Sequence, residues 1–346
     1  MKRFLALTLV LLVALLAGMF AIGWYQDNRM SNFEGTARIY VREDTSVDDV
    51  IGQIGKQTTI RNVKRLRRVF EQKEVARYLT PGFYQIGKSN TSVYVARMLN
   101  NGWQSPVNLT MSGSMRRNSD IAHRIASQMM ADSAALMKVM KDEKFLAAYG
   151  VTPRTVFSLI IPDTYEMYWT ASPEEIFARF KQEYDKFWTE ENVAKARKLN
   201  LSKQQVSILA SIVRAESNYA PELPKIAGVY LNRLKTGMLL QADPTVAFCY
   251  DYKPNRILKR HLEVDSRYNT YKYPGLPPGP ICVPAKECLE AVLNPDFGGS
   301  YGAGGNLYFC ANPDFSGTHV FAKTLSAHNA NAAAFQAELN RRNIKK

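Results

Sequence analysis

The chain has 346 residues, 46% of them hydrophobic and 11% aromatic, and it carries a formal net charge of +14. This composition excludes an intrinsically disordered chain, which combines low hydrophobicity with high charge, and its length suits about two domains. The basic excess suggests an anionic partner, such as nucleic acid, a lipid surface or an acidic polymer.

The first segment is long enough to cross a bilayer. Residues 4–24 contain no charged side chain, and Lys2 and Arg3 precede them. A spanning helix needs about 20 apolar residues, whereas the core of a signal peptide usually has roughly 7–15. Residues 17–21 offer only a weak cleavage site. We therefore predict a retained single-pass anchor at residues 1–26, with a cleaved signal peptide as the alternative. Either reading exports the rest of the chain and argues against nucleic acid as a partner.

A small α/β unit is predicted at residues 37–101, after a short polar linker at 27–35. Its expected elements are a strand at 37–41, helices at 45–54 and 61–78, a strand at 82–86 and a helix at 92–99. This strand–helix–helix–strand order resembles the LysM-like module that binds glycan chains. A plain spacer domain is the alternative.

A connecting α/β region is predicted at residues 102–200. We expect a strand at 107–111, helices near 118–131 and 134–148, an apolar run at 157–169 and an amphipathic helix from Pro173 to about Trp188.

The four cysteines, Cys249, Cys282, Cys288 and Cys310, all lie in the last third of the chain. Four cysteines in an exported protein allow three pairings, and spacing does not select one. Their pattern with the histidines matches no zinc motif, so we expect structural disulfides or buried thiols, with no metal and no cofactor.

A helix that carries an acidic residue begins the last region, residues 201–346. Ser202 and Gln205 form a capping-box pattern, so the helix should start at Lys203. Glu216 falls on the apolar stripe of this helix, and Ser207, Ser211 and Arg214 fall on the opposite face. Burial of a carboxyl raises its pKa, which suits a general acid. The alternative is a carboxylate that pairs with Arg or Lys where the helix emerges.

Several motifs surround this helix. Residues 208–246 read ILASIVRAESNYAPELPKIAGVYLNRLKTGMLLQADPTV, and YNTY (268–271), GLPPGPI (275–281) and GTHVF (317–321) follow. Together with PDTY (162–165) they resemble the YceG-like family, the MltG endolytic murein transglycosylases, over essentially the whole exported region. The resemblance implies an α+β fold with an N-terminal transmembrane helix, a small LysM-like βααβ unit and a mixed α+β catalytic domain.

The resemblance also implies roles for single residues. The family's catalytic glutamate corresponds to Glu216, and where relatives commonly have a second glutamate this chain has Arg214. Polar groups and tyrosines suit the hydroxyls and acetamides of sugars. The residues expected to line the glycan cleft are Asn232, Gln241, Asp243, Thr245, Tyr268, Asn269, Thr270, Tyr271 and His319.

The implied function is an endolytic lytic transglycosylase, which cleaves the bond between N-acetylmuramic acid and N-acetylglucosamine and leaves a 1,6-anhydro end. The enzyme would sit in the bacterial inner membrane, with its catalytic domain on the periplasmic side, near peptidoglycan synthases. Two alternatives stay open. One is a two-carboxylate muramidase with Asp243 as the second acid; the other is a non-catalytic wall-binding scaffold.

Overall fold

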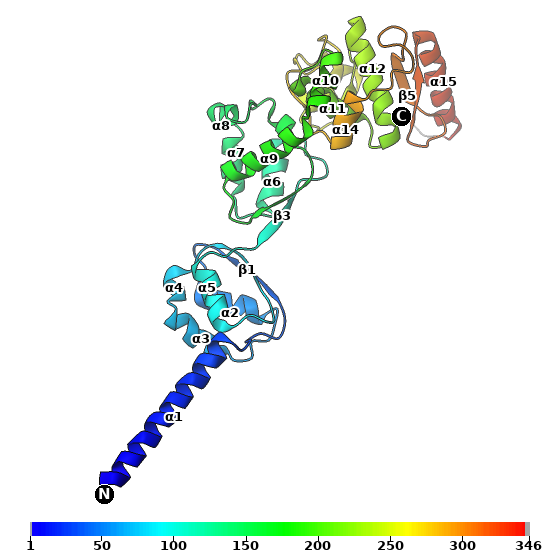
Figure 1. The fold of residues 1–346 in the computed structure, drawn as a ribbon. Coiled ribbons are helices and arrows are strands. Elements are labelled where there is room, and N and C mark those ends of the chain that lie inside the picture. The colour runs from blue at the N-terminus through cyan, green and yellow to red at the C-terminus, as the bar shows by residue number, and fades with distance from the viewer. Residues whose placement is uncertain (1, 343–346) are drawn as a thin grey trace. The chain divides into compact units, whose positions relative to one another are not determined.

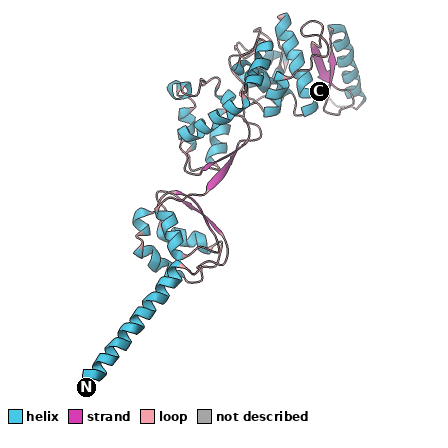
Figure 2. Cartoon of the chain, viewed as in Figure 1, coloured by secondary structure: helices cyan, strands magenta, loops and turns pink. Residues whose placement is uncertain are grey.

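A computed structural model describes residues 2–342, and its elements fall into two compact units (Figures 1 and 2). The first comprises Met1–Leu109, Gln128–Ala131 and Glu166–Ser172; the second comprises Thr110–Ser127, Asp132–Tyr165 and Pro173–Lys346. Helices predominate, and the strands form two-stranded sheets (Figure 2). The predicted α+β class is confirmed.

The first helix, α1 (Lys2–Asn28), presents an apolar surface that the chain itself leaves uncovered. A stretch of 18 residues within 4–28 reaches a mean hydropathy of 2.8, and length and composition alone make this helix able to cross a membrane. It runs four residues beyond the predicted apolar span. At its end the Asp27 carboxylate accepts two hydrogen bonds from the Arg68 guanidinium, at 2.7 and 2.8 Å.

The residues after α1, which we predicted to be a short polar linker at 27–35, include two that are packed inside the first unit. Asn32 and Phe33 are fully buried in the first unit. The Asn32 amide donates to the Asn62 carbonyl and the Ser92 hydroxyl, and its oxygen accepts from the Asn62 amide at 3.0 Å. A buried polar side chain that forms hydrogen bonds with other buried groups in this way helps to hold the first unit together.

The first unit is built around an antiparallel pair, β1 (Ala37–Val41) and β2 (Gly82–Ile86), in which Ile39 lies opposite Tyr84. The connecting helices are α2 (Val47–Gly55), α3 (Val63–Gln72) and the one-turn α4 (Val75–Tyr78), and α5 (Ser92–Asn100) follows. The predicted helix at 61–78 is therefore two helices. It breaks at Glu74, whose φ of 49° lies in the left-handed region and cannot continue an α-helix.

Strands β3 (Pro106–Thr110) and β4 (Thr164–Tyr168) pair with each other, and most of each strand belongs to the first unit. The second unit begins with helices, which are α6 (Asn118–Ala126), α7 (Ser133–Val139), α8 (Glu143–Ala147), η1 (Val156–Leu159), α9 (Pro173–Phe187) and α10 (Glu190–Lys198). Where two longer helices were predicted there are three. The Asp132 and Asp142 side chains accept from the backbone amides at the starts of α7 and α8, and each of these caps begins a new helix.

The core of the second unit surrounds α11 (Lys203–Glu216), which packs against α12 (Leu223–Thr236) and α14 (Lys286–Leu293) (Figure 1). The remaining elements are η2 (Ala220–Glu222), α13 (Asp243–Cys249), η3 (Lys259–Glu263), the antiparallel pair β5 (Tyr308–Ala311) and β6 (His319–Ala322), and α15 (Leu325–Arg341), which covers that pair.

Helix α11 starts at Lys203 with the predicted capping box, but its polar face is not exposed. Ser207 and Ser211 are buried because the segment that contains Ile281 covers this face. The Ile281 amide donates to the Ser211 hydroxyl at 3.0 Å, and that hydroxyl donates to the Ile208 carbonyl. Sequence periodicity places these serines opposite the apolar stripe, but it does not show the second layer of the protein that covers them.

The backbone of helix α12 lies in direct contact with the backbone at Asp296. A Cβ atom at Gly228 would lie 2.0 Å from the Asp296 carbonyl oxygen, so no larger residue fits without displacement. The Asp296 amide also donates to the Pro224 carbonyl at 2.9 Å.

All four cysteines are free thiols. Cys282 and Cys288 are buried in the second unit, as one of the two expected alternatives requires.

Candidate active site

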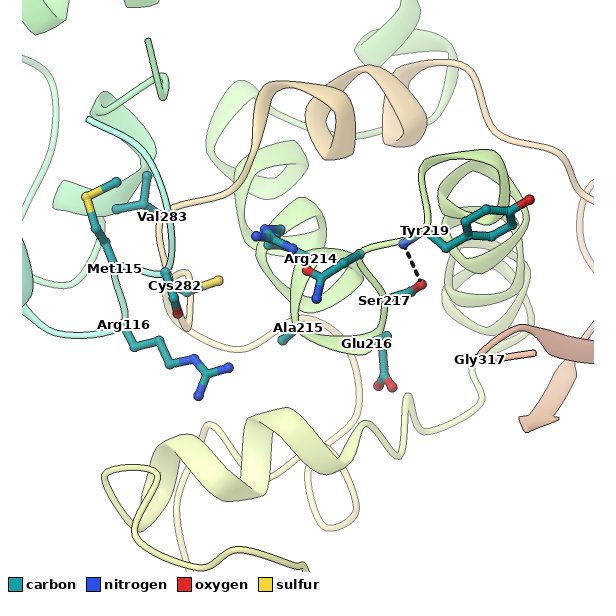
Figure 3. Close-up of a pocket in the computed structure, with 13 residues that line it drawn as sticks. Met115, Arg116, Arg214, Ala215, Glu216, Ser217, Tyr219, Cys282, Val283 and Gly317 are labelled. Atoms are coloured by element: carbon teal, nitrogen blue, oxygen red, sulfur yellow. Dashed lines mark hydrogen bonds between the residues drawn. The ribbon is translucent and has the colours of Figure 1, made fainter. Parts of the chain in front are cut away.

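A cavity of about 600 Å³ opens beside the end of α11 (Figure 3). Its described lining residues are Gly113, Ser114, Met115, Arg116, Arg214, Ala215, Glu216, Ser217, Asn218, Tyr219, Cys282, Val283 and Gly317. Glu216 is the one acidic residue among them. The volume lies in the range of small-ligand sites, and the mixture of polar groups suits a hydroxylated ligand.

Glu216 is the last residue of α11, and the chain turns extended at Ser217. The Glu216 side chain lies between Arg116 and Gly317 in the view of Figure 3. The Tyr230 hydroxyl, on α12, donates to Oε1 of Glu216 at 2.6 Å. This bond holds one carboxyl oxygen and leaves the other for a ligand.

Burial raises the pKa of Glu216 to about 7, because desolvation penalises the charged form. The hydrogen bond from Tyr230 acts in the opposite direction. The negative charge of Asp243 raises the pKa further, and the positive charges of His319 and Arg233 lower it. A carboxyl with this pKa is partly protonated at neutral pH, so it can both give and take a proton.

Arg233 lies one turn beyond Tyr230 on α12 and is almost fully buried. Its Nε donates to the Leu307 carbonyl at 2.7 Å, and one terminal nitrogen donates to the Leu240 carbonyl at 2.8 Å. Arg233 thereby ties α12 to the start of β5 and to the loop before α13. Desolvation lowers the pKa of the Arg233 guanidinium.

Asp243 and Tyr271 form a second carboxylate–tyrosine pair near Glu216. The Tyr271 hydroxyl donates to Oδ1 of Asp243 at 2.6 Å. Burial raises the pKa of Tyr271 most, and this hydrogen bond raises it further. Gln241 lies just before, exposed, with a φ of 52°, and its amide donates to the Thr270 carbonyl. A non-glycine residue in this conformation is strained and is often held at a functional site.

Thr245 and Thr270 are buried and hold the two motifs together. Their hydroxyl oxygens lie 2.8 Å apart. The Thr245 hydroxyl donates to the Ala242 carbonyl, and the Thr270 hydroxyl accepts from the Ala242 amide at 3.0 Å.

Asn232 and Asn269 are likewise fully buried. The Asn232 amide donates to the Phe297 and Asn306 carbonyls, and its oxygen accepts from the Gly302 amide at 2.8 Å. The Asn269 amide donates to the Leu262 and Val264 carbonyls, and its oxygen accepts from the Tyr271 amide at 3.0 Å.

The four buried residues therefore do not occupy the place that we predicted for them. Asn232, Thr245, Asn269 and Thr270 use their polar groups inside the protein, so none is left to contact a sugar. They shape the loops that carry Gln241, Asp243 and Tyr271, for which contact with a glycan stays a prediction.

His319 and Tyr268 lie at two different edges of the site. Nδ1 of His319 lies 2.9 Å from Oε2 of Glu222, and the His319 amide donates to the other oxygen of that carboxylate at 2.7 Å. The Tyr268 ring packs against the Phe248 ring at a tilt of 34°, with centroids 4.5 Å apart, and Tyr268 lines a neighbouring cavity of about 400 Å³.

Sequence reasoning missed Tyr230, Arg233 and the 113–116 loop. Arg233 belongs to the NRL motif and Tyr230 lies two residues before that motif; the two are three positions apart and thus on one helix face, which is a signal that could have found them. The loop reaches the site from about 100 positions earlier in the chain, held by a bond from the Val283 amide to the Met115 carbonyl, and no local pattern shows that approach.

Fold and site together define an α+β protein with a single apolar N-terminal helix and a carboxyl of raised pKa at the edge of an open polar cleft. Residues 39–334 match the model of the YceG-like family, and the chain belongs to that family.

Similar proteins bear a consistent name. A *Bacillus subtilis* protein named endolytic murein transglycosylase is 28% identical over 313 residues, which cover 85% of this chain and 83% of the relative. One of the same name from *Streptococcus pneumoniae* is 23% identical, and the match covers 96% of this chain and 65% of that relative. A crystal structure of a putative YceG-like protein from *Listeria monocytogenes* is 26% identical and superposes with a TM-score of 0.55, over 85% of this chain and 98% of that one.

Proposed function

We propose that this protein is a lytic transglycosylase that cleaves the glycan strands of peptidoglycan, with Glu216 as its general acid and then its general base. Family membership and the names of the relatives support the class of reaction. The observation that carries the assignment to Glu216 is the raised pKa of a cavity-lining carboxyl oriented by Tyr230.

The first step is protonation of the glycosidic oxygen between N-acetylmuramic acid and N-acetylglucosamine. The neutral Glu216 carboxyl gives its proton to this oxygen as the bond from C1 breaks, and N-acetylglucosamine leaves as the alcohol. Tyr230 stabilises the resulting carboxylate, because its hydrogen bond favours the charged form.

In the second step the Glu216 carboxylate takes the proton of the muramoyl C6 hydroxyl, and that oxygen bonds to C1. The product is a 1,6-anhydro end, no water is consumed, and Glu216 is again neutral. One carboxyl can serve twice because the nucleophile belongs to the same sugar and needs no activation from a second residue.

The position of Asp243 supports this reaction over hydrolysis with two carboxylates. Hydrolytic glycosidases place one carboxyl on each side of the scissile bond. Asp243 is not among the described residues that line the cavity, and its Oδ1 is engaged by the Tyr271 hydroxyl.

The apolar α1 suits a single-pass anchor, and we place the second unit on the extracytoplasmic side of a bacterial membrane, where peptidoglycan lies. We assign glycan binding to the first unit, whose β1–α2–α3–α4–β2 order agrees with a LysM-like module. The four-part domain division and contact with peptidoglycan synthases stay predictions.

Product analysis tests the proposal. Wild type and Glu216→Gln are incubated with purified peptidoglycan, and the products are identified by mass spectrometry. We expect 1,6-anhydro ends from wild type and none from Glu216→Gln, while Glu263→Gln, an exposed carboxylate in the same unit, keeps full activity. Anhydro products from Glu216→Gln would overturn the role of Glu216, and reducing ends from wild type would assign the protein to hydrolysis.

A further inference from the structure

Two arginines line the cavity that contains Glu216, and neither has an acidic partner among the described residues. Arg116 is exposed and stacks over the Tyr252 ring, with its guanidinium carbon 4.7 Å from the ring centroid. Arg214 is half-buried, two residues before Glu216 on α11. The neighbouring Arg117, by contrast, forms an ion pair with Asp251 at 2.6 Å.

Arg116 and Arg214 both line the cavity on the side where Cys282 lies. Both lie near enough to the Cys282 thiol to lower its pKa, against the larger effect of burial. Figure 3 shows Cys282 beside these two arginines and apart from Tyr219 and Gly317.

The proposed mechanism does not use these charges. The positive charges that act most strongly on Glu216 are those of His319 and Arg233. Because the mechanism gives Arg116 and Arg214 no other role, they can bind a group of the substrate that lies a short distance from the scissile bond.

Resting on the proposed function, we propose that Arg116 and Arg214 form a subsite for a carboxylate carried by the muramoyl residue. A planar guanidinium binds carboxylates with paired, charge-assisted hydrogen bonds. Each muramoyl residue carries a lactyl ether on C3, which ends either in its own carboxylate or in a peptide with carboxylates. Near Glu216 and Asp243 such a group would be repelled, and the arginines offset that repulsion.

The residues that line the two cavities indicate where a substituent bound at this subsite continues. Arg116 also lines the neighbouring cavity of about 400 Å³, together with Arg154, Tyr252 and Tyr268. A substituent that starts beside Glu216 can therefore continue past Arg116 along a surface that is again basic and aromatic. This continuity favours an extended substituent, the peptide, over the lactyl carboxylate alone.

The test compares wild type with Arg116→Gln/Arg214→Gln on three substrates. These are glycan strands with intact peptides, strands stripped by an amidase to the free lactyl carboxylate, and stripped strands whose lactyl carboxylates are blocked as methylamides. Arg256→Gln/Arg267→Gln removes two exposed arginines outside the cavity and serves as the charge-matched control. If the double variant folds poorly, Arg116→Lys/Arg214→Lys, which keeps both charges, and the two single Gln variants replace it.

We expect KM to rise about tenfold on the strands with intact peptides, with kcat little changed, because charge-assisted bonds to a bound group are lost. KM on the neutral strands should not change. A rise on intact strands alone identifies the peptide carboxylates as the ligand, and a rise on stripped strands identifies the lactyl group. An equal rise on the neutral strands, or none on any substrate, overturns the subsite. Absence of cleavage by wild type on all three would instead count against the proposed function.

Discussion

The hydroxyl of Tyr230 donates to Oε1 of Glu216 at 2.6 Å, from a helix that packs directly against the helix carrying the carboxyl. This bond opposes the effect of burial. Burial favours the neutral acid that the first step needs, and Tyr230 favours the carboxylate that the second step needs.

Replacement of Tyr230 by Phe should raise the pKa of Glu216, because it removes a hydrogen bond to the charged form. The rate of a reaction that needs the neutral acid falls as pH rises through this pKa. The alkaline limb of the pH profile of kcat/KM should therefore move upward by about one pH unit in Tyr230→Phe. A downward shift or an unchanged limb would contradict the assignment, whatever the height of the profile.

Glu216 should also make the fold less stable above neutral pH. Its folded pKa of about 7 lies above the ordinary glutamate pKa of 4.5, so the folded state binds the proton more tightly. Below pH 4 both states are protonated and the group contributes nothing. Between these two pKa values stability falls with rising pH, and above pH 7 the full cost, at most about 3 kcal/mol, is present.

Glu216→Gln should accordingly be more stable than wild type at pH 8 and of equal stability at pH 4, as measured by urea unfolding. The exposed Glu263→Gln should show no such difference. Equal stabilisation of Glu216→Gln at both values would indicate a packing effect instead of a titration.

Arg233 combines a structural and an electrostatic role, and two substitutions separate them. Arg233→Lys and Arg233→Met should both destabilise the protein by about 2 kcal/mol, because neither can bond the Leu240 and Leu307 carbonyls together. Only Met removes the positive charge that lowers the pKa of Glu216. The alkaline limb should move upward in Arg233→Met and stay near the wild-type position in Arg233→Lys; equal shifts would contradict this division.

Thr270 should matter for stability more than for recognition. Thr270→Val keeps the shape but leaves the Ala242 amide without its acceptor, which should cost about 1–3 kcal/mol in thermal or urea unfolding. Thr270→Ser keeps the hydroxyl and should cost less. A larger loss in Ser than in Val would show that packing of the methyl group dominates.

Local features of this fold could be predicted from the sequence. The 37–41 and 82–86 strands match β1 and β2, and the capping box at Ser202 starts α11 at Lys203. These features depend on neighbours within a few positions, where residue periodicity and side-chain caps act. The break at Glu74 was missed because a glutamate gives no local signal of the left-handed backbone conformation that it adopts.

Contacts between residues that lie far apart in the sequence could not be predicted in the same way. Motif residues such as Asn232 and Thr270 look like ligands for a sugar, yet their partners are backbone groups up to 74 positions away. Arg116 belongs to no motif, and it reaches the cavity only because Val283 holds Met115. A polar residue within a motif can thus serve the substrate or the loop that carries the substrate contacts, and only tertiary structure separates the two.

Gly228 lies two residues before Tyr230, at the point where α12 meets the Asp296 carbonyl. The contact is between backbones, which cannot change rotamer to absorb a misfit. This backbone contact therefore fixes the position and rotation of α12. The direction in which the Tyr230 hydroxyl points is fixed with them. A methyl group added at Gly228 would have to push the helix aside, and this displacement would move the Tyr230 hydroxyl away from its place beside the Glu216 carboxyl.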